Sequence, residues 1–160
     1  MIRKARRVLK LSREQGIRLA TAESCTGGLL SGAITTVPGS SDVFDRGYVT
    51  YSNGAKVELL GVEPKVLSQF GAVSEEVAHE MASGALLHSG AHLAVSITGL
   101  AGPGGSAHKP DGRVCFGLAR EGRPTHTETV EFGALGRTRV RRAAVHKALE
   151  MMIASLEETA

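Results

Sequence analysis

The feature that most constrains this chain is a short apolar run that leads into two adjacent glycines and then into a second apolar segment. Residues 17–22 are typical of a β-strand, Ser24-Cys25-Thr26-Gly27-Gly28 is typical of a tight turn, and the apolar residues from Leu29 onward are typical of a helix. Strand, turn and helix in this order are a building unit of open α/β sheets. Polar groups in such a turn lie at the carboxyl edge of the sheet, where α/β folds usually place their sites.

The rest of the chain continues this alternation. We expect further helices over residues 2–14, 53–60, 64–70, 74–87 and 137–156, and further strands over residues 44–52, 92–98, 113–119 and 125–132. The turn between the last two strands indicates a β-hairpin. We therefore predict the α/β class, with a mixed sheet covered by helices on both faces in a three-layer α/β/α arrangement. With 160 residues and 42% apolar content, one domain over residues 1–160 is expected.

Composition narrows the class of function. No run approaches the roughly 18 continuous apolar residues that a membrane span needs, and the basic first ten residues lack the apolar block of a signal peptide, so we expect a cytoplasmic protein. Cys25 and Cys115 belong to no CxxC pair, which fits a reducing compartment without disulfides. The six histidines have no HExxH spacing and no zinc spacing with cysteine, so no metal site is expected.

Basic residues cluster near both ends, over residues 3–10 and 137–142, although the formal net charge is only +3. Such clusters favour an anionic partner. With no Trp, two Tyr and four Phe, there is little from which to build a base-stacking surface. We therefore expect a phosphate-bearing small molecule rather than a nucleic acid.

Two loops offer hydroxyl groups. In the turn of residues 24–28, Ser24 and Thr26 are either site residues or ordinary helix caps, and both interpretations stay open. Cys25 is interpreted as a buried filler rather than a nucleophile, because no histidine lies near it in sequence. The loop Pro38-Gly39-Ser40-Ser41 is the second source of hydroxyls, with a plain turn as the alternative.

A lysine follows the next predicted strand. Tyr51 ends that strand, and Lys56 lies about one turn into the following short helix, from which it can point back over the sheet edge. Desolvation there lowers the pKa of a lysine and makes it a usable base for a serine hydroxyl. Tyr51 then relays a proton or orients the pair. The alternative is that Lys56 is a solvated surface lysine.

Two further segments are candidates for nucleotide binding. The Gly-rich stretch after the buried strand of residues 92–98 has converging N–H groups, with Thr98 and Gly99 at its start, and it lacks the Gly-Lys-Ser/Thr ending of a P-loop. In the last helix, Arg137 and Arg141 fall on the apolar stripe that continues to Leu156. At a helix start the dipole disfavours cations by about 0.3–1 kcal/mol each, so a bound anion removes the conflict. Ion pairs with Asp45, Glu128 or Glu131 are the alternative.

With these segments identified, the sequence resembles the family of CinA C-terminal domains, whose stand-alone members are nicotinamide-nucleotide amidases. The resemblance covers nearly the whole chain. Its motifs are Ala22-Glu23-Ser24-Cys25-Thr26-Gly27-Gly28, Pro38-Gly39-Ser40-Ser41, Val49-Thr50-Tyr51-Ser52-Asn53 with Ala55-Lys56, Gly71-Ala72-Val73-Ser74, Thr98-Gly99-Leu100-Ala101-Gly102-Pro103 and Lys109-Pro110.

The resemblance implies hydrolysis of the carboxamide of nicotinamide mononucleotide to nicotinic acid mononucleotide and ammonia, without a cofactor. Carried to matching positions, it implies a site formed by Ser24, Ser41, Tyr51, Lys56, Thr98 and Arg141. We expect Ser41 to be the acyl acceptor and Lys56 its base, with Ser24 and the Gly27-Gly28 turn hydrogen-bonding the oxyanion. We expect the substrate to be held by Thr26, Gly27, Gly28, Thr98, Gly99, Arg137 and Arg141.

The sequence also departs from the family pattern. The full-length relatives carry an additional N-terminal domain that this sequence lacks, and the segment 104–113 differs where another glycine and a Val-Gly-Thr pattern are expected. Two alternatives therefore stay open: a nucleotide-binding module without turnover, related to competence or repair, and an amidase for another phosphorylated amide. Because small amidohydrolase domains with polar clefts are often dimers, we expect a homodimer.

Overall fold

The computed structural model describes residues 1–106 and 108–158. The chain forms six α-helices, one 3-10 helix and five strands within these residues. In chain order they are α1 (Ile2–Gln15), β1 (Leu19–Glu23), α2 (Leu29–Thr35), η1 (Ser40–Asp42), β2 (Phe44–Val49), α3 (Asn53–Leu60), α4 (Pro64–Phe70), α5 (Glu75–Leu87), β3 (Leu93–Gly99), β4 (Arg113–Arg120), β5 (His126–Glu131) and α6 (Arg137–Glu157).

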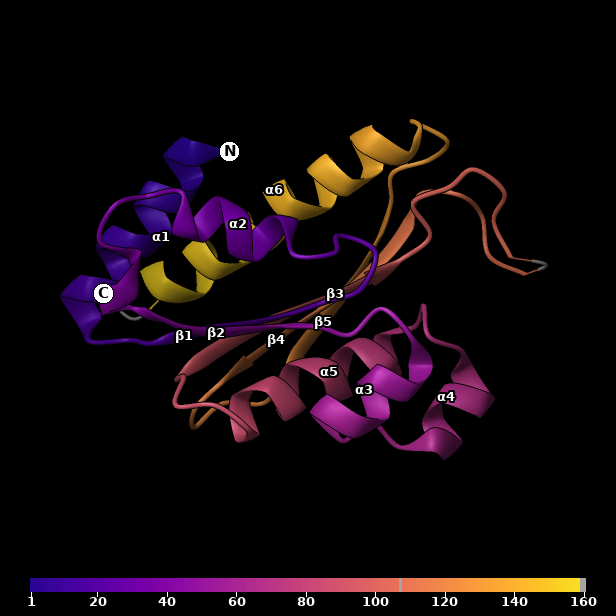
Figure 1. Cartoon of the computed structure of the whole chain (residues 1–160), viewed down its shortest axis with the longest axis horizontal. Coiled ribbons are helices and arrows are strands. Elements are labelled where there is room, and N and C mark those ends of the chain that lie inside the picture. Colours follow the sequence, from indigo (N-terminus) through magenta and orange to yellow (C-terminus); the bar gives the residue numbers. More distant parts are fainter. Residues whose placement is uncertain (107, 159–160) are drawn as a thin grey trace.

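The five strands form one mixed sheet in the order β2-β1-β3-β4-β5. Strands β2, β1 and β3 are parallel to one another, whereas β4 and β5 are antiparallel to their neighbours. Helices α1, α2 and α6 cover one face, and α3, α4 and α5 cover the other (Figure 1). The predicted three-layer α/β/α fold with a mixed sheet is confirmed.

A hydrophobic core lies on each side of the sheet. All five residues of β1 are buried, as a central parallel strand requires. On one face, the core is formed by residues of α1, α2 and α6, such as Leu30 and Met152, together with side chains of the sheet. On the other face, Leu60 and Met81 pack with α3, α4 and α5. Both predicted helix layers therefore have an apolar side that is turned toward the sheet.

Glycine and serine set several helix ends where the sequence predicted them. Gly16 and Gly61 adopt the left-handed conformation after α1 and α3, which is typical of a helix C-terminus. The hydroxyl of Ser52 accepts a hydrogen bond from the Ala55 N–H, and that of Ser74 accepts one from the Val77 N–H. The signals at Ser52 and Gly61 explain why the predicted bounds of α3 match the structure.

Strand β2 is shorter than predicted. It ends at Val49 instead of Ser52, because the carbonyl groups of Thr50 and Tyr51 accept hydrogen bonds from Nζ of Lys56 rather than extending a strand. The 3-10 helix η1 that precedes β2 was not predicted either. None of the described helices is both long enough and apolar enough to cross a membrane.

Candidate functional site

The candidate site lies where the chain changes direction across the sheet. From β1 the chain passes through α2 to β2 on one side, and from β2 it returns through α3, α4 and α5 to β3 on the other side of β1. The carboxyl ends of these parallel strands lie at one edge, and the crevice between β1 and β3 is a topological switch point. The turn after β1 and the Gly-rich segment after β3 both begin there.

A pocket of about 320 Å³ opens at this edge. It brings together the turn after β1, the start of α3, the α4–α5 connection, the end of β3 and the start of α6. Its lining residues are Ser24, Cys25, Tyr51, Asn53, Lys56, Ala72, Val73, Thr98, Gly99, Leu100, Ala101, Gly102, Pro103, Gly104 and Arg137.

Lys56 and Ser24 meet inside this pocket. Lys56 is only 1% exposed, and its Nζ lies 3.1 Å from Oγ of Ser24, which is 8% exposed. The lysine comes from the first turn of α3, so its side chain reaches back over the end of the sheet as predicted. Lys56 is therefore a buried residue of the site rather than a solvated surface lysine.

Burial makes it easier for Lys56 to lose its proton, and its hydrogen bonds determine where the resulting lone pair points. Burial lowers the pKa of Lys56 below the ordinary lysine value of 10.5. Besides Ser24, its Nζ lies 2.8 Å from the Thr50 carbonyl oxygen and 3.4 Å from that of Tyr51. A neutral amine has two N–H donors and one lone pair, so when the two carbonyl groups accept its hydrogens the lone pair faces the Ser24 hydroxyl.

A buried carboxylate fixes the turn that carries Ser24. Glu23, the last residue of β1, is fully buried. Its two oxygens accept hydrogen bonds from the backbone N–H groups of Gly28, Leu30 and Ser31 and from the Ser31 hydroxyl, over distances of 2.7–3.2 Å. No role for Glu23 was predicted from the sequence. The available signal was a glutamate directly between a buried strand and a Gly-containing helix start.

We expect Glu23→Gln to destabilise the protein although its shape is conserved. The amide nitrogen of glutamine cannot accept hydrogen bonds, so donors on α2 lose an acceptor, and we expect a loss of about 2 kcal/mol in the free energy of unfolding. Urea denaturation measures this loss. The matched control is Glu14→Gln, which removes only an exposed ion pair with Lys10 and should leave the unfolding midpoint unchanged. Equal midpoints for both variants would contradict the assigned role of Glu23.

The oxyanion donors expected in the turn need correction. The Gly28 N–H already donates to the Glu23 carboxylate, and the Gly27 N–H donates to the Ser24 carbonyl oxygen. Within the described part of the chain, no backbone carbonyl group accepts from the N–H groups of Cys25 and Thr26, and the Cys25 N–H faces its own thiol. These two groups directly follow Ser24 in sequence and, unlike those of Gly27 and Gly28, donate to no backbone carbonyl group or carboxylate of the described residues.

The structure does not bring Ser41 to Lys56. Ser41 is exposed in η1, before the first residue of β2, whereas Lys56 follows the last residue of that strand. A six-residue strand spans roughly 17 Å, so the two residues lie at opposite edges of the sheet. We therefore correct the expected pairing: the hydroxyl at hydrogen-bond distance from Lys56 is that of Ser24.

Two arginines of α6 reach the site, as its predicted inward stripe implies. Arg137 donates to the Tyr51 hydroxyl at 2.9 Å and to the Gly102 carbonyl oxygen at 3.0 Å, bridging the pocket mouth. Arg141 donates to the carbonyl oxygens of Cys25 and Thr26 at 3.0 and 3.4 Å. Tyr51 is 60% exposed and contributes only its backbone carbonyl to Lys56. Arg141 thus braces the turn, while Arg137 and Tyr51 lie at the rim.

The alternative ion pairs for these arginines are not formed. Asp45 pairs with Arg18 and Arg46. Glu128 pairs with Lys147 and His126, and Glu131 pairs with Arg113. Among the residues that the structure describes, none of the four arginines of residues 137–142 has a carboxylate partner. The basic cluster of residues 3–10 differs, since Lys4, Arg7 and Lys10 all form ion pairs.

The remaining predicted residues take supporting positions. The Thr98 hydroxyl donates to the Ala72 carbonyl oxygen at 2.8 Å, and Gly99 lines the pocket beside it. Thr26 is fully buried. Burial raises the pKa of Cys25 to about 11, so its thiol is a poor nucleophile, in line with the predicted filler role. No group of three His, Cys, Asp or Glu side chains within residues 1–106 and 108–158 is arranged to hold a metal ion.

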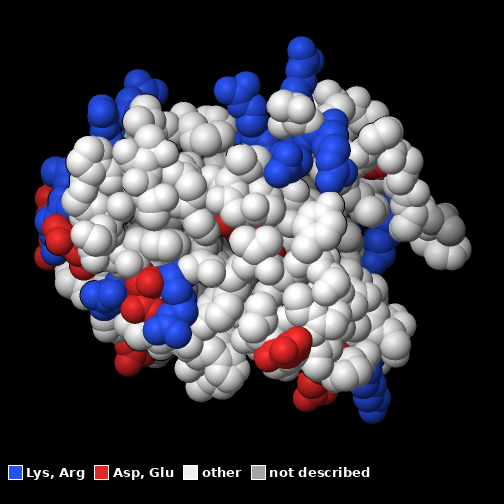
Figure 2. Space-filling model, in the orientation of Figure 1, with Lys and Arg blue, Asp and Glu red and all other residues white. Residues whose placement is uncertain are grey.

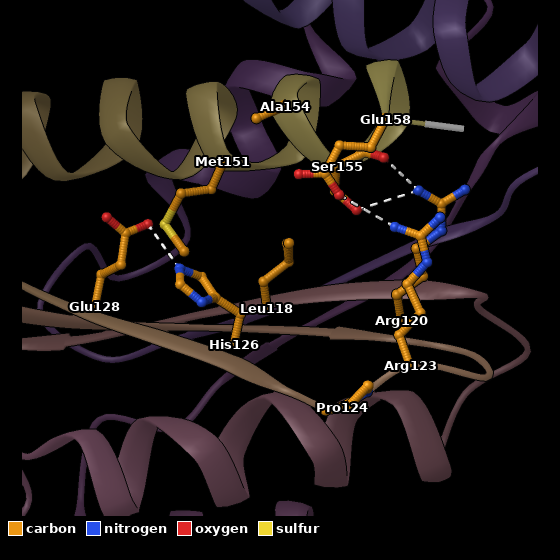
Figure 3. Close-up of a pocket in the computed structure, with 10 residues that line it drawn as sticks. All are labelled: Leu118, Arg120, Arg123, Pro124, His126, Glu128, Met151, Ala154, Ser155 and Glu158. Carbon is orange, nitrogen blue, oxygen red and sulfur yellow. Dashed lines mark hydrogen bonds and ion pairs between the residues drawn. The ribbon is translucent and has the colours of Figure 1, made fainter. Parts of the chain in front are cut away.

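A second pocket, of about 280 Å³, lies between the end of α6 and the β4–β5 hairpin (Figure 3). Its charged groups are engaged within the protein: Arg123 pairs with Glu158, and His126 lies 3.2 Å from Glu128. Arg120 donates to the hydroxyl of Ser155. A guanidinium cannot accept a proton from that hydroxyl, so Arg120 cannot act on Ser155 as Lys56 can act on Ser24.

The sheet order and the first pocket define a three-layer α/β protein with a polar site at its switch point. The chain belongs to the family of CinA C-terminal domains, whose model matches residues 2–156. A protein of Enterobacter agglomerans named nicotinamide-nucleotide amidohydrolase PncC is 60% identical over 111 residues, which cover 68% of this chain and 68% of that protein.

Other relatives carry less specific names. A CinA-like protein of Chlorobium phaeobacteroides is 55% identical over 126 residues, or 77% of this chain and 30% of that protein. The chain spans about a third of the length of the CinA-like and competence-damage inducible relatives that it matches. The crystal structure of the competence/damage inducible protein CihA from Agrobacterium tumefaciens is 48% identical and has a TM-score of 0.94, with 98% of this chain and 94% of that chain covered.

Proposed function

We propose that this protein is an amidohydrolase that converts nicotinamide mononucleotide to nicotinic acid mononucleotide and ammonia, with Ser24 as the nucleophile and Lys56 as the general base. The observation that carries the proposal is the buried Lys56 Nζ, 3.1 Å from the Ser24 hydroxyl, in the pocket that Arg137 borders. The substrate assignment is supported by the 60% identity to a protein named nicotinamide-nucleotide amidohydrolase.

The reaction follows from the geometry of this pair. Neutral Lys56 takes the hydroxyl proton while Oγ of Ser24 attacks the carboxamide carbon, which forms a tetrahedral intermediate. Lys56 then gives the proton to the amide nitrogen and the C–N bond breaks. Ammonia departs, and the acyl group remains bound to Ser24 as an ester. Lys56 next takes a proton from water, the resulting hydroxide attacks the ester carbon, and the acid is released as Ser24 regains its proton.

The developing negative charge needs donors beside the nucleophile. We assign this role to the backbone N–H groups of Cys25 and Thr26, which directly follow Ser24. Their orientation depends on both sides of the turn. On one side, Arg141, which can only donate, forms hydrogen bonds to the carbonyl oxygens of Cys25 and Thr26. On the other side, the Glu23 carboxylate accepts hydrogen bonds from N–H groups at the start of α2. The donors are thus fixed before substrate enters, which avoids reorganisation during the reaction.

The start of α6 supplies the charge for a phosphate group. Lysine and arginine side chains gather along the edge of the molecule where α1 and α6 lie (Figure 2). Because Arg137 has no carboxylate partner among the described residues, a phosphate group at the pocket mouth can draw it away from Tyr51 and Gly102. Binding energy from the phosphate then positions the distant carboxamide for attack by Ser24.

The test measures ammonia release from nicotinamide mononucleotide and from nicotinamide riboside, which lacks the phosphate. We expect turnover of the nucleotide and a kcat/KM for the riboside that is lower by about 10²-fold, because one or two charge-assisted contacts are lost. Thermal shift with nicotinic acid mononucleotide reports binding independently of turnover.

Each alternative function predicts a different result. Stabilisation by the nucleotide without any ammonia release would replace the amidohydrolase with a binding module. Faster release from another phosphorylated amide would keep the reaction and change the substrate. Equal kcat/KM for nucleotide and riboside would contradict the role of the α6 arginines.

A further inference from the structure

One wall of the candidate site has no regular secondary structure of its own. Residues 71–74 connect α4 to α5, and Ala72 and Val73 line the pocket that also contains Ser24 and Lys56. A loop of this kind keeps its position only if its backbone groups are held by other parts of the protein.

Side chains hold every carbonyl group of this connection. Lys109, which follows the Gly-rich segment, donates from Nζ to the carbonyl oxygens of Phe70 at 2.8 Å and Val73 at 2.6 Å. Between them, the Gly71 carbonyl accepts from the hydroxyl of Ser74 and the Ala72 carbonyl accepts from that of Thr98, each at 2.8 Å. Four consecutive acceptors are thus satisfied, two of them by one ammonium group.

The connection is shaped to receive this lysine. Gly71 has φ 78° and ψ 162°, a conformation open essentially to glycine alone. A Cβ at this position would lie 2.9 Å from Nζ of Lys109. Within the described residues, no carboxylate forms an ion pair with Lys109. Its charge is therefore directed at the two carbonyl groups, and charge-assisted hydrogen bonds of this kind are stronger than neutral ones.

We propose that Lys109 is a positioning residue that holds the Ala72–Val73 wall against the substrate, opposite the Ser24–Lys56 pair. This inference rests on the proposed function. Lys109 lies outside the lining of the pocket and acts on it through the backbone of residues 70–73. When the lysine is removed, the wall moves and the carboxamide is no longer held at the Ser24 hydroxyl.

The first test is Lys109→Met with nicotinamide mononucleotide as the substrate. We expect KM to rise by about tenfold and kcat/KM to fall by about 10–10²-fold, because small misplacements of a bound substrate have effects of this size. The midpoint of the pH–rate profile should stay unchanged, since Lys56 remains in place. The matched control is Lys65→Met on the exposed surface of α4, which should leave both constants within twofold of wild type.

Chemical rescue separates positioning from a general loss of structure. Alkylation of the new thiol of Lys109→Cys with 2-bromoethylamine rebuilds a side chain of lysine length with a terminal ammonium. Cys25 and Cys115 are buried with raised pKa values, so they should not react, and treated wild-type protein checks this. We expect alkylation to lower KM again to within about threefold of wild type.

Hydrogen exchange gives a readout that needs no substrate. Amides of residues 71–74 should exchange faster in Lys109→Met than in wild type and Lys65→Met. An unchanged KM in Lys109→Met, a failure of alkylation to restore it, or unchanged exchange at residues 71–74 would each overturn the inference. Absence of ammonia release by the wild type is a separate result, which would overturn the proposed function. The role of Lys109 in holding residues 71–74 would then be tested by hydrogen exchange alone.

Discussion

Ser24→Ala should lower kcat/KM for ammonia release from nicotinamide mononucleotide by at least about 10³-fold, because the substitution removes the proposed nucleophilic oxygen. The fold should be retained, since Ser24 is a small residue and its backbone N–H bond to the Ile97 carbonyl oxygen does not involve the side chain. The measurements are steady-state ammonia release and mass spectrometry of rapidly quenched protein, in which the ester intermediate should appear only when Ser24 is present.

The matched control is Ser41→Ala, which removes an exposed hydroxyl at the opposite edge of the sheet. We expect its kcat/KM to stay within about twofold of wild type. If Ser41→Ala loses activity while Ser24→Ala keeps it, the nucleophile must be reassigned to Ser41, and the pairing of Lys56 with Ser24 loses its catalytic meaning.

Lys56→Met should also lower kcat by at least about 10³-fold, because the methionine side chain fills a similar space but cannot accept a proton. In wild type, the neutral amine is the active form, so kcat/KM should rise with pH and level off. Burial lowers the pKa of Lys56, so the midpoint of this rise should lie below 10.5. A midpoint at or above the ordinary lysine value, or full activity of Lys56→Met, would contradict the assigned base.

The same lysine makes stability depend on pH in a predictable direction. Because the folded pKa is lower than the unfolded pKa, the unfolded chain binds more protons between these two values. The free energy of unfolding of wild type should therefore rise with pH in this window, relative to Lys56→Met, which lacks the titrating group. Urea denaturation of both proteins from about pH 7 to about pH 10 measures the difference. A constant difference would indicate that the pKa of Lys56 is not shifted.

Much of the fold was predictable because local signals mark the element ends. The helices α3 and α4 were predicted with the bounds that the structure shows, since Gly61, Pro64 and Gly71 separate them and Ser52 caps the first. The ends of the strands were predicted less accurately than those of the helices α3 and α4. In sequence, Thr50 is a strand-forming residue that continues β2. Its carbonyl oxygen instead accepts a hydrogen bond from Lys56 in the next helix, and no local sequence pattern reveals this contact.

For the site, the sequence predicted the lysine and its environment better than its partner. Ser41 was expected to be the acyl acceptor, and its loop precedes β2, whereas Lys56 follows that strand. A residue before a strand and a residue after the same strand nevertheless lie at opposite ends of that strand, and so at opposite ends of the sheet. Ser24 is more distant in sequence, but the parallel pairing of β1 with β2 brings the two carboxyl ends together.

Contacts between distant segments account for the residues that sequence analysis missed. Glu23 follows a pattern of buried strand residues, and only the structure shows that four donors of α2 and its preceding turn surround its carboxylate. Lys109 belongs to a motif, yet its hydrogen bonds reach carbonyl groups more than thirty residues away in sequence. Neither role has a periodicity by which it can be recognised, and the only signal for Glu23 was its position between a buried strand and a Gly-containing helix start.

The bridge from Arg137 to Tyr51 and Gly102 joins the last helix to two earlier segments of the chain. The proposed nucleophile and base are both present within the first 56 residues, but the positive charge at the pocket mouth comes from α6. A nascent chain therefore carries its reactive pair well before it can capture a phosphorylated compound. Tight nucleotide binding should thus require that α6 has folded against the rest of the protein. A nucleotide bound in this pocket should slow unfolding from both ends of the polypeptide.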